Sequence, residues 1–569
     1  MVVVVGAWLL LAVFVLAAWS RLNTRRSWRI IAVLLALGFS LAHQLLFSTV
    51  AEDAFITFRY ALNIAEGNGP VFNVGERVEG YSNFLWMVLL ALFKTLFGAD
   101  IVGTAVVLGV LSTLGCVVLA YVLVHRIVRK GRGTEDSAPA FGVAAAVLTA
   151  GASGLAAYGP SGLETPLFLL LALCICLSVA ENRCVMAGVL VALAVMTRPD
   201  GVVIAIVVGI WLVVRAARHR VDWWAPAGYV LGALVLAVPW TAWRVTYYGY
   251  LVPNALAAKS GAPLGWQLEQ GGAYLVEFGV AHGGFLLLAV AALVLFVVRR
   301  PHADRAEGVP EPDVILARSV VWLVVALTVF YLAFITYAGG DWMPAWRLLA
   351  PVPPLVAIGS LAALGVAGGG VRTGASPSPR PRRFWLDKAV VPVAIVLSGL
   401  SLFASITHEQ MLERMHDWRD AIAELGEIGD WFGATLPSGT VVSTFANGAL
   451  SYEAGSRIVM LDVLGLTDEH IARHGQRDKR LGLVGHLAQD YDYVVNERMP
   501  AVAITTGSGY SETQRCGADP LYAGRYLVAT FRRVGTDNWV KVYLIREQVT
   551  WLVETLGADP RFEHVPCGE

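Results

Sequence analysis

The chain has 569 residues, of which 56% are hydrophobic and only 15% are charged, and its 43 basic residues equal its 43 acidic residues. Because soluble proteins carry roughly 25% charged residues, this composition excludes an ordinary soluble protein, and the zero net charge does not indicate nucleic acid as a partner. Apolar runs of roughly 18 or more residues, long enough to cross a bilayer, recur along most of the chain. The sequence therefore predicts a mainly α, polytopic membrane protein.

About twelve membrane-spanning helices are predicted in chain order. The first is expected to be a retained span rather than a cleaved signal peptide, because no basic residues precede it and no clear cleavage site follows it. The predicted spans are 2–19, 30–49, 101–124, 139–157, 163–180, 184–197, 200–214, 226–247, 276–298, 316–337, 347–366 and 387–405.

Basic stretches predict the orientation of the spans, because Arg and Lys accumulate in cytoplasmic loops. These stretches are 21–29, 125–132, 215–220, 299–305 and 372–383. If all of them lie inside, the loops richest in distinctive polar residues and everything after about residue 405 lie on the extracytoplasmic side of the plasma membrane. We therefore expect any chemistry to face outward.

The apolar segment 84–97 is left out of these spans. It has about 14 residues, which is short for a crossing, and it contains Lys94. If it did cross, the basic stretch 125–132 would fall outside. We predict an interfacial or re-entrant helix; the alternative is a short, tilted span.

The last 160 or so residues change character. Segment 411–432 has helical spacing, and short strand-like runs follow at 440–443, 457–460, 492–495, 526–531 and 539–545. We divide the chain into a transmembrane domain, 1–405, and an extracytoplasmic α/β domain, 406–569. A disulfide between Cys516 and Cys567 requires this second domain to lie outside the cytoplasm.

Two adjacent carboxylates, Glu52 and Asp53, follow directly after the apolar run 30–50. Ionised side chains at a membrane boundary are costly, so an acidic pair there indicates a site. The alternative is a hydrated loop that happens to begin with acids. In the outer loop 51–82, Asp53 and Tyr60 are expected on one side of a short helix, with Arg59 on a neighbouring side.

Further carboxylates, cations and aromatic residues lie in the other loops predicted to face outward. The tyrosines near 247–250 have a structural alternative as an interfacial belt. Arg198 and Asp200 can pair with each other. Arg77 can neutralise Glu76 or Glu79. The whole set comprises Glu164, Arg198, Asp200, Arg244, Tyr247, Tyr248, Tyr250, Lys259, Asp341 and Arg347.

Carboxylates, cations and aromatics together at an outer surface suit sugar transfer from a lipid phosphate. Arg and Lys hold the phosphate, aromatic rings stack on the sugar or the prenyl carbons, and a carboxylate removes the proton of the acceptor hydroxyl. The sequence shows no nucleotide-binding motif and no metal-ligand cluster. We therefore expect no cofactor, and a phosphate held by Arg and Lys makes a metal dispensable without excluding one.

Several segments carry a family resemblance in order along the chain. They are EDAFITFRYALNIAEGNGPVFNVGERVEGYSNFLW, SGLETPLF, RPDG, RVTYYGYLVPNALAAK, GGDWMP and LDVLGLTD. The set resembles the integral-membrane GT-C glycosyltransferases, most of all the actinobacterial terminal (β-1,2) arabinofuranosyltransferases of cell-wall arabinan. This resemblance implies a transmembrane bundle of the GT-C type. It also implies inverting transfer of arabinofuranose from decaprenyl phosphate to an arabinan acceptor of arabinogalactan or lipoarabinomannan.

The resemblance places the catalytic pair on Glu52 and Asp53, with Asp53 as the general base. The arabinosyl enzymes tend to carry two aspartates here, so Glu52 puts the donor sugar in question more than the chemistry. The implied ligands of the donor phosphate are Arg59, Arg198, Arg244, Lys259 and Arg347. The implied substrate-binding residues are Glu164, Asp200, Tyr248, Asn254, Asp341 and Trp342.

The expected partners are a polyprenyl-phosphate-linked sugar donor, a glycan acceptor and the lipid bilayer. The outer tail is expected to help bind the acceptor, and Asp462 could face the membrane site. Two alternatives stay open. One is a GT-C enzyme that uses polyprenyl-phospho-mannose or glucose, and the other is a flippase or transporter for lipid-linked sugars, although no paired symmetry of the halves is apparent.

Overall fold

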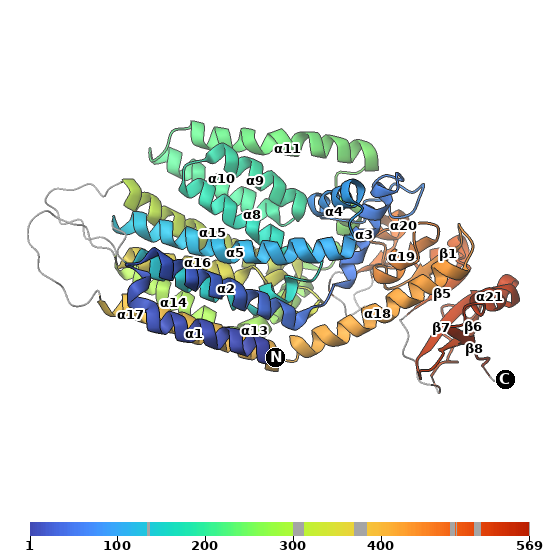
Figure 1. The fold of residues 1–569 in the computed structure, drawn as a ribbon. Helices are drawn as coiled ribbons and strands as arrows, with labels where there is room; N and C mark the ends of the chain where they lie inside the picture. The colour runs from blue at the N-terminus through green and yellow to red at the C-terminus, as the bar shows by residue number, and fades with distance from the viewer. Residues whose placement is uncertain are drawn as a thin grey trace, which may run out of the picture. The chain divides into compact units, whose positions relative to one another are not determined.

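The computed structural model describes residues 1–133, 137–299, 312–368, 384–477, 484, 486–505, 512 and 514–567 (Figure 1). The basic stretch 372–383, and all of 299–305 except Arg299, lie outside the described residues. The helices are α1 (Val2–Leu22), α2 (Arg26–Phe47), α3 (Glu52–Ala65), α4 (Phe84–Phe97), α5 (Ile101–Arg132), α6 (Ala138–Ala150), α7 (Ser153–Tyr158), α8 (Thr165–Ala180), α9 (Cys184–Thr197), α10 (Gly201–Ala217), α11 (Trp224–Tyr248), α12 (Asn254–Lys259), α13 (Leu264–Ala281), α14 (Gly283–Val298), α15 (Pro312–Ala338), η1 (Pro344–Leu349), α16 (Val352–Ala367), α17 (Phe384–Thr407), α18 (Leu412–Thr435), α19 (Ala449–Glu453), α20 (Glu469–His474), η3 (Tyr493–Arg498), η4 (Arg546–Gln548) and α21 (Val549–Leu556). The strands are β1 (Val441–Thr444), β2 (Val459–Asp462), β3 (Gln476–Arg477), β4 (Ala488–Gln489), β5 (Val502–Ile504), β6 (Tyr526–Arg533), β7 (Trp539–Ile545) and β8 (Phe562–His564).

Seven helices of the described residues are long and apolar enough to cross a membrane, and the bent pair α13 and α14 would add an eighth. The seven are α1, α2, α5, α11, α15, the segment Pro344–Ala367, and Lys388–Thr407 of α17. The chain is a multi-pass membrane protein. Helices α4, α6, α8, α9 and α10 are apolar but shorter, so the predicted number of about twelve spans stays a prediction.

Predicted spans 276–298 and 139–157 are not continuous helices. Segment 276–298 is broken at His282, where α13 and α14 meet at 90°. Two glycines, which disfavour helix, follow His282, and the ring of Trp346 packs edge-on against it at 5.6 Å. Segment 139–157 is broken where Gly151 ends α6. A Cβ at Gly151 would lie 2.7 Å from the Ser398 Cβ of α17, so the break coincides with a close helix contact.

Contacts divide the chain into two compact units that are not continuous in sequence. Unit 1 contains 1–48, 106–240 and 264–415, and unit 2 contains 49–105, 241–263 and 416–569. The division therefore differs from the sequence-based boundary at 405/406, because the first predicted outer loop and the segment around α12 pack with the tail. The membrane side on which either unit lies stays a prediction.

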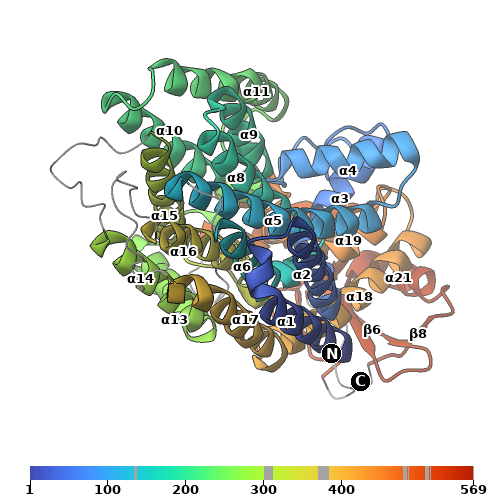
Figure 2. The same cartoon turned by 60° about the vertical axis from the view of Figure 1, so that its left-hand side comes forward.

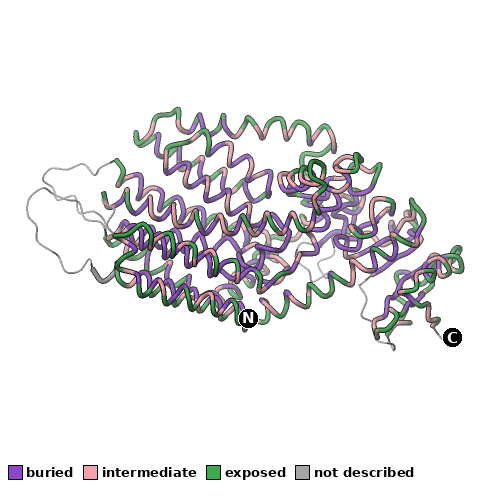
Figure 3. Tube along the Cα trace, in the orientation of Figure 1, coloured by how far each residue is buried: buried purple, intermediate pink, exposed green. Residues whose placement is uncertain are grey.

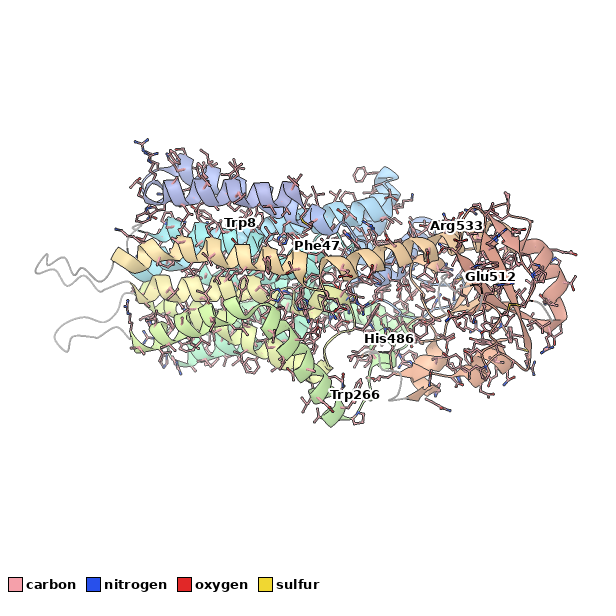
Figure 4. All side chains as sticks on the ribbon, turned by 90° about the horizontal axis from the view of Figure 1, so that it is seen from below. Trp8, Phe47, Trp266, His486, Glu512 and Arg533 are labelled. Atoms are coloured by element: carbon pink, nitrogen blue, oxygen red, sulfur yellow. A yellow bond between two sulfur atoms is a disulfide. The ribbon has the colours of Figure 1, made fainter. Side chains whose placement is uncertain are left out.

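Unit 1 is a bundle built around α6 and α16. Every residue of α6 is buried, and α6 packs against α2, α16 and α17. Small residues such as the alanines of α6 let helix backbones approach closely in membranes. Helix α1 lies beside α2 and α17 in Figure 1 and Figure 2. Trp8, labelled in Figure 4, donates its indole N–H to Ser398 Oγ at 3.1 Å. The outer helix α11 is largely exposed or half-buried (Figure 3).

Unit 2 contains a six-stranded mixed sheet in the order β2-β1-β5-β7-β6-β8. Strand β1 pairs in parallel with β2 and β5, whereas β5–β7, β7–β6 and β6–β8 are antiparallel. Helix α18 packs its apolar face here, with the Trp431 ring stacked on Phe562 at 4.2 Å. Arg533 of β6, labelled in Figure 4, forms an ion pair with Glu427 of α18 at 2.9 Å. The predicted α/β fold of the tail is confirmed.

The strand predicted at 492–495 is wrong. This segment forms the helical turn η3. Asp490 explains the difference, because its side chain accepts the Tyr493 N–H at 3.1 Å and its carbonyl accepts the Val494 N–H at 3.1 Å. A side-chain acceptor of this kind caps a helical turn rather than a strand.

Candidate active site

The predicted acid pair stands at the first turn of α3. Ala51 is the N-cap, and Glu52 and Asp53 follow it, where the positive end of the helix dipole favours acidic residues. The two carboxyls differ in environment: Glu52 is only 8% exposed, whereas Asp53 is half-buried. Asp53 is therefore the more accessible carboxyl of the pair.

Glu52 is held by the tail within unit 2. The backbone N–H of Gly448, just before α19, donates to Glu52 Oε1. Burial, together with the charges of Asp53 and Asp462, raises the pKa of Glu52 to about 8. At neutral pH Glu52 is therefore largely protonated.

The tail loop that contains Asp462 lies close to this contact. Asp462, at the end of β2, is fully buried and accepts the backbone N–H groups of Leu464 and Thr467, each at 2.9 Å. Thr467 Oγ accepts from Asn447 Nδ2 at 2.8 Å. Burial raises the pKa of Asp462 to about 6 in spite of these bonds. A chain of hydrogen bonds thus joins Asp462 to the residue next to Gly448.

Arg59, predicted to bind the donor phosphate, is 1% exposed. Its Nε donates to the Phe72 carbonyl at 2.8 Å, and its Nη atoms donate to the carbonyls of Ser451 and Ile458. It also donates to Asn73 Oδ1 at 3.4 Å. Burial lowers the pKa of Arg59 to about 9. These contacts argue for a structural role, in which Arg59 joins α3 to the tail, and against phosphate binding.

Arg244 and Tyr248, both predicted ligands, lie at the C-terminal end of α11. Arg244 Nε forms a buried ion pair with Glu79 Oε2 at 3.0 Å. The Tyr248 hydroxyl donates to the Pro70 carbonyl at 2.7 Å and contacts the Tyr81 hydroxyl at 3.1 Å. Both side chains therefore connect the C-terminal end of α11 to the first predicted outer loop, 51–82.

Asn254 and Lys259 begin and end α12. The Asn254 side-chain amide donates to the carbonyls of Gly465, Leu466 and Asp468 at 2.9–3.1 Å, which ties α12 to the Asp462 loop. Lys259 is half-buried and forms no ion pair with any residue that the structure describes. Of the predicted cations in unit 2, Lys259 is therefore the most available to an anion.

In unit 1, the predicted residues Glu164, Arg198 and Asp200 come together. Arg198 contacts both oxygens of Asp200 at 2.9–3.2 Å and Glu164 Oε1 at 3.5 Å. The Tyr331 hydroxyl donates to Asp200 Oδ2 at 3.0 Å. The Arg198–Asp200 ion pair, considered as an alternative from the sequence, is therefore present, and Glu164 also pairs with Arg198.

A second predicted group in unit 1 also comes together. Arg347, in η1, makes a two-pronged contact with Asp341, at 2.6 and 3.2 Å. The Trp342 backbone N–H donates to Asp341 Oδ1 at 3.0 Å. Ala345 and Trp346 have φ of 54° and 49°, in the left-handed region that non-glycine residues avoid. Strain of this kind gathers at functional segments.

Sequence reasoning missed Gly448 and Asn447, which help bring the tail to the acid pair, whereas Thr467 stands in the quoted segment LDVLGLTD. Nothing in the local pattern around Gly448 distinguishes it from other turn glycines. Within the described ranges, no group of three or more His, Cys, Asp and Glu residues is placed to hold a metal ion. The expectation that no metal is needed stays a prediction.

A family model described as "Domain of unknown function (DUF8728)" matches residues 408–543. Two curated relatives are terminal β-(1→2)-arabinofuranosyltransferases. The chain is 28% identical to that of Corynebacterium glutamicum over 347 residues, which is 53% of this chain and 46% of the relative. It is 30% identical to that of Mycobacterium tuberculosis over 386 residues, which is 63% of this chain and 58% of the relative. The matches thus span about half the length of these relatives, and the predicted resemblance is confirmed.

The fold is similar to that of ArnT from Cupriavidus metallidurans, whose crystal structure holds undecaprenyl phosphate. The TM-score is 0.52 at 14% identity, and the match covers 91% of this chain and 97% of that chain. ArnT is a GT-C enzyme. A likeness at this identity concerns the fold alone, and the predicted GT-C fold is confirmed.

Proposed function

We propose that this protein is a membrane glycosyltransferase that transfers arabinofuranose from decaprenyl phosphate to a cell-wall arabinan acceptor on the outer face of the membrane, with inversion. The observation that carries the proposal is the similarity to terminal arabinofuranosyltransferases, together with an accessible Asp53 beside a buried Glu52. The ArnT structure with undecaprenyl phosphate supports a polyprenyl phosphate as the donor's carrier.

Asp53 acts as the general base in the proposed reaction. The acceptor oxygen forms a bond to the anomeric carbon of the arabinose while Asp53 takes the hydroxyl proton. The bond from that carbon to the phosphate oxygen breaks, and decaprenyl phosphate leaves with the electron pair. Attack from the face opposite the phosphate inverts the anomeric centre. Because Glu52 is largely protonated, it adds no negative charge that would repel the leaving phosphate.

Lys259 is the cation we assign first to the donor phosphate, because its ammonium group has no ion pair among the described residues. Arg59 and Arg198 are left out, since buried protein acceptors surround both.

The disulfide between Cys516 and Cys567 supports the outward orientation of the tail. Disulfides persist in oxidising compartments and are rare in the cytosol. The sequence left the pairing of these cysteines open, and the structure contains the bond.

The test is a transfer assay with the purified full chain in nanodiscs. Radiolabelled decaprenyl-phospho-arabinofuranose, polyprenyl-phospho-mannose and polyprenyl-phospho-glucose are offered separately with a short arabinan acceptor. Product from the arabinofuranose donor alone is expected. Product from mannose or glucose instead would move the protein to the rival donor class, and lipid scrambling without any product would favour the flippase.

A further inference from the structure

A small polar pocket in unit 2 has no role in the proposed chemistry. Its lining includes side chains that can form hydrogen bonds or stack on a ligand, among them Arg77, Tyr248, Tyr250, Asn254, Glu469 and Arg473. Its open space of about 190 Å³ includes solvent outside the lining, so it is a partly open surface recess rather than an enclosed cavity. Such a recess can contact one face of a ligand that otherwise lies in solvent.

Arg77 presents an available cation to this pocket. It is exposed, and its guanidinium lies 4.8 Å from the centre of the Tyr247 ring. Its two neighbouring acids are engaged elsewhere, since Glu76 pairs with Arg498 at 3.3 Å and Glu79 pairs with Arg244 at 3.0 Å. Arg77 forms no ion pair within the described part of the chain, so the neutralisation considered from the sequence does not occur there.

The opposite lining comes from α20 and the loop before α12. The Arg473 guanidinium stacks on Tyr250 at 3.5 Å, and its Nη2 donates to the Val252 carbonyl at 3.1 Å. The Tyr250 hydroxyl donates to Glu469 Oε1 at 2.6 Å. Arg473 Nε and Asn254 Oδ1 are buried and have no hydrogen-bond partner among the described residues. Among the described residues, the pocket therefore has one hydrogen-bond donor without a partner, Arg473 Nε, and one acceptor without a partner, Asn254 Oδ1. The donor lies beside the Tyr250 ring.

We propose that this pocket binds a single sugar ring of the glycan acceptor, which rests on the proposed function. A sugar hydroxyl is both a donor and an acceptor, so it matches a pocket that offers arginine donors together with carboxylate and amide oxygens. The lining holds two cations, Arg77 and Arg473, and two carboxyls, Glu79 and Glu469, and this balance suits a neutral polyol better than an ion. The rings of Tyr248 and Tyr250 supply apolar surface for the sugar's C–H face.

The first experiment measures binding directly. A synthetic arabinofuranose trisaccharide is titrated into the full chain in nanodiscs, followed by tryptophan fluorescence or saturation-transfer NMR. We expect Arg77→Ala and Glu469→Gln each to raise the Kd about tenfold, the loss of one charge-assisted hydrogen bond. Both residues are exposed, so the fold tolerates these changes. Arg532→Ala is the matched control, because Arg532 is an exposed arginine of β6 outside the pocket, and its Kd should stay at the wild-type value.

Kinetics then separate this proposal from the proposed function. In the transfer assay we expect the pocket variants to raise KM for the acceptor about tenfold, while kcat and KM for the donor stay unchanged. Wild-type binding and acceptor KM in both variants would overturn the pocket and leave the function standing. If the wild type binds the trisaccharide and the variants do not, but no protein shows transfer activity, the pocket proposal is supported and the proposed function is rejected. Competition by inorganic phosphate as strong as by the trisaccharide would overturn the sugar assignment.

Discussion

Two neighbouring carboxyls at the start of α3 lie in different environments, because one is buried and the other is half-buried. Glu52 accepts a backbone N–H of the tail and is largely protonated, whereas Asp53 stays accessible. We expect Asp53→Asn to lower kcat at least about 100-fold, the usual contribution of a general base, with folding unchanged.

The matched variant is Glu52→Gln, which keeps a neutral group in the same place. Because Glu52 is already largely neutral at pH 7, we expect Glu52→Gln to retain activity within about tenfold. Both values come from the transfer assay at saturating donor. Full activity of Asp53→Asn, or an equal loss in both variants, would contradict the division of roles.

The raised pKa of Glu52 also predicts how stability depends on pH. The folded pKa is about 8 and the ordinary value is 4.5, so the folded state binds the proton more tightly than the unfolded state. The resulting stability is fully present below about pH 4.5 and is lost as the pH rises to about 8. Each unit of pKa difference corresponds to about 1.4 kcal/mol.

Glu52→Gln cannot ionise and should escape this loss. We therefore expect the unfolding temperature of Glu52→Gln in detergent to increase relative to that of the wild type as the pH rises from 5 to 8. Parallel pH profiles of the two proteins would mean that Glu52 is not a protonated group in the folded state.

Single residues also mark the limit of sequence reasoning here. The acid pair is predictable because carboxylates beside a long apolar run are unusual. The role of Arg59 cannot be predicted in this way, because its acceptors Ser451 and Ile458 are 392 and 399 positions away along the chain. A local pattern shows a cation in a loop, and only the packing of the tail shows that its N–H groups are already used.

At the scale of elements, α3 approaches the loop before α19 closely enough to require a glycine. A Cβ at Gly448 would collide with the Glu52 carbonyl oxygen and lie 2.6 Å from Glu52 Oε1. We expect Gly448→Ala to push α3 away from the loop, to lower kcat at least about tenfold and to destabilise unit 2 by about 1–3 kcal/mol, the usual cost of overpacking.

Gly426→Ala in α18 is the control for this prediction. A Cβ there meets its nearest atom at an ordinary 3.5 Å, and alanine is favoured over glycine in a helix interior by up to about 1 kcal/mol. The control should therefore be neutral or stabilised, with full activity. Transfer kinetics and thermal unfolding measure both variants, and a Gly448→Ala protein with wild-type kinetics would show that the contact does not position the acids.

Elements were predictable where their ends carry local signals. Helix α4 has the predicted bounds, because its apolar run is bounded by Asn83 and by Gly98, whose φ of 64° ends the helix. Strand β7 likewise has the predicted bounds. The bend between α13 and α14 was missed, since an apolar run through two glycines predicts one span when no packing partner such as Trp346 is known.

At the scale of the whole molecule, the Cys516–Cys567 disulfide offers a test of which side of the membrane the tail occupies. Disulfide-forming compartments lie outside the cytosol. The other four cysteines are buried or half-buried and can be replaced by alanine to remove background labelling.

In intact cells carrying that variant, we expect a membrane-impermeant reductant followed by a membrane-impermeant maleimide to label both tail cysteines. Without the reductant no label should be taken up, because both sulfurs are bonded. The bond closes a loop across a sequence separation of 51, so its reduction should also lower the stability of the tail by about 2–4 kcal/mol. Labelling that appears only after the cells are permeabilised would place the tail inside. A tail inside the cell could not bind an acceptor on the outer face, so this result would also contradict the proposed reaction.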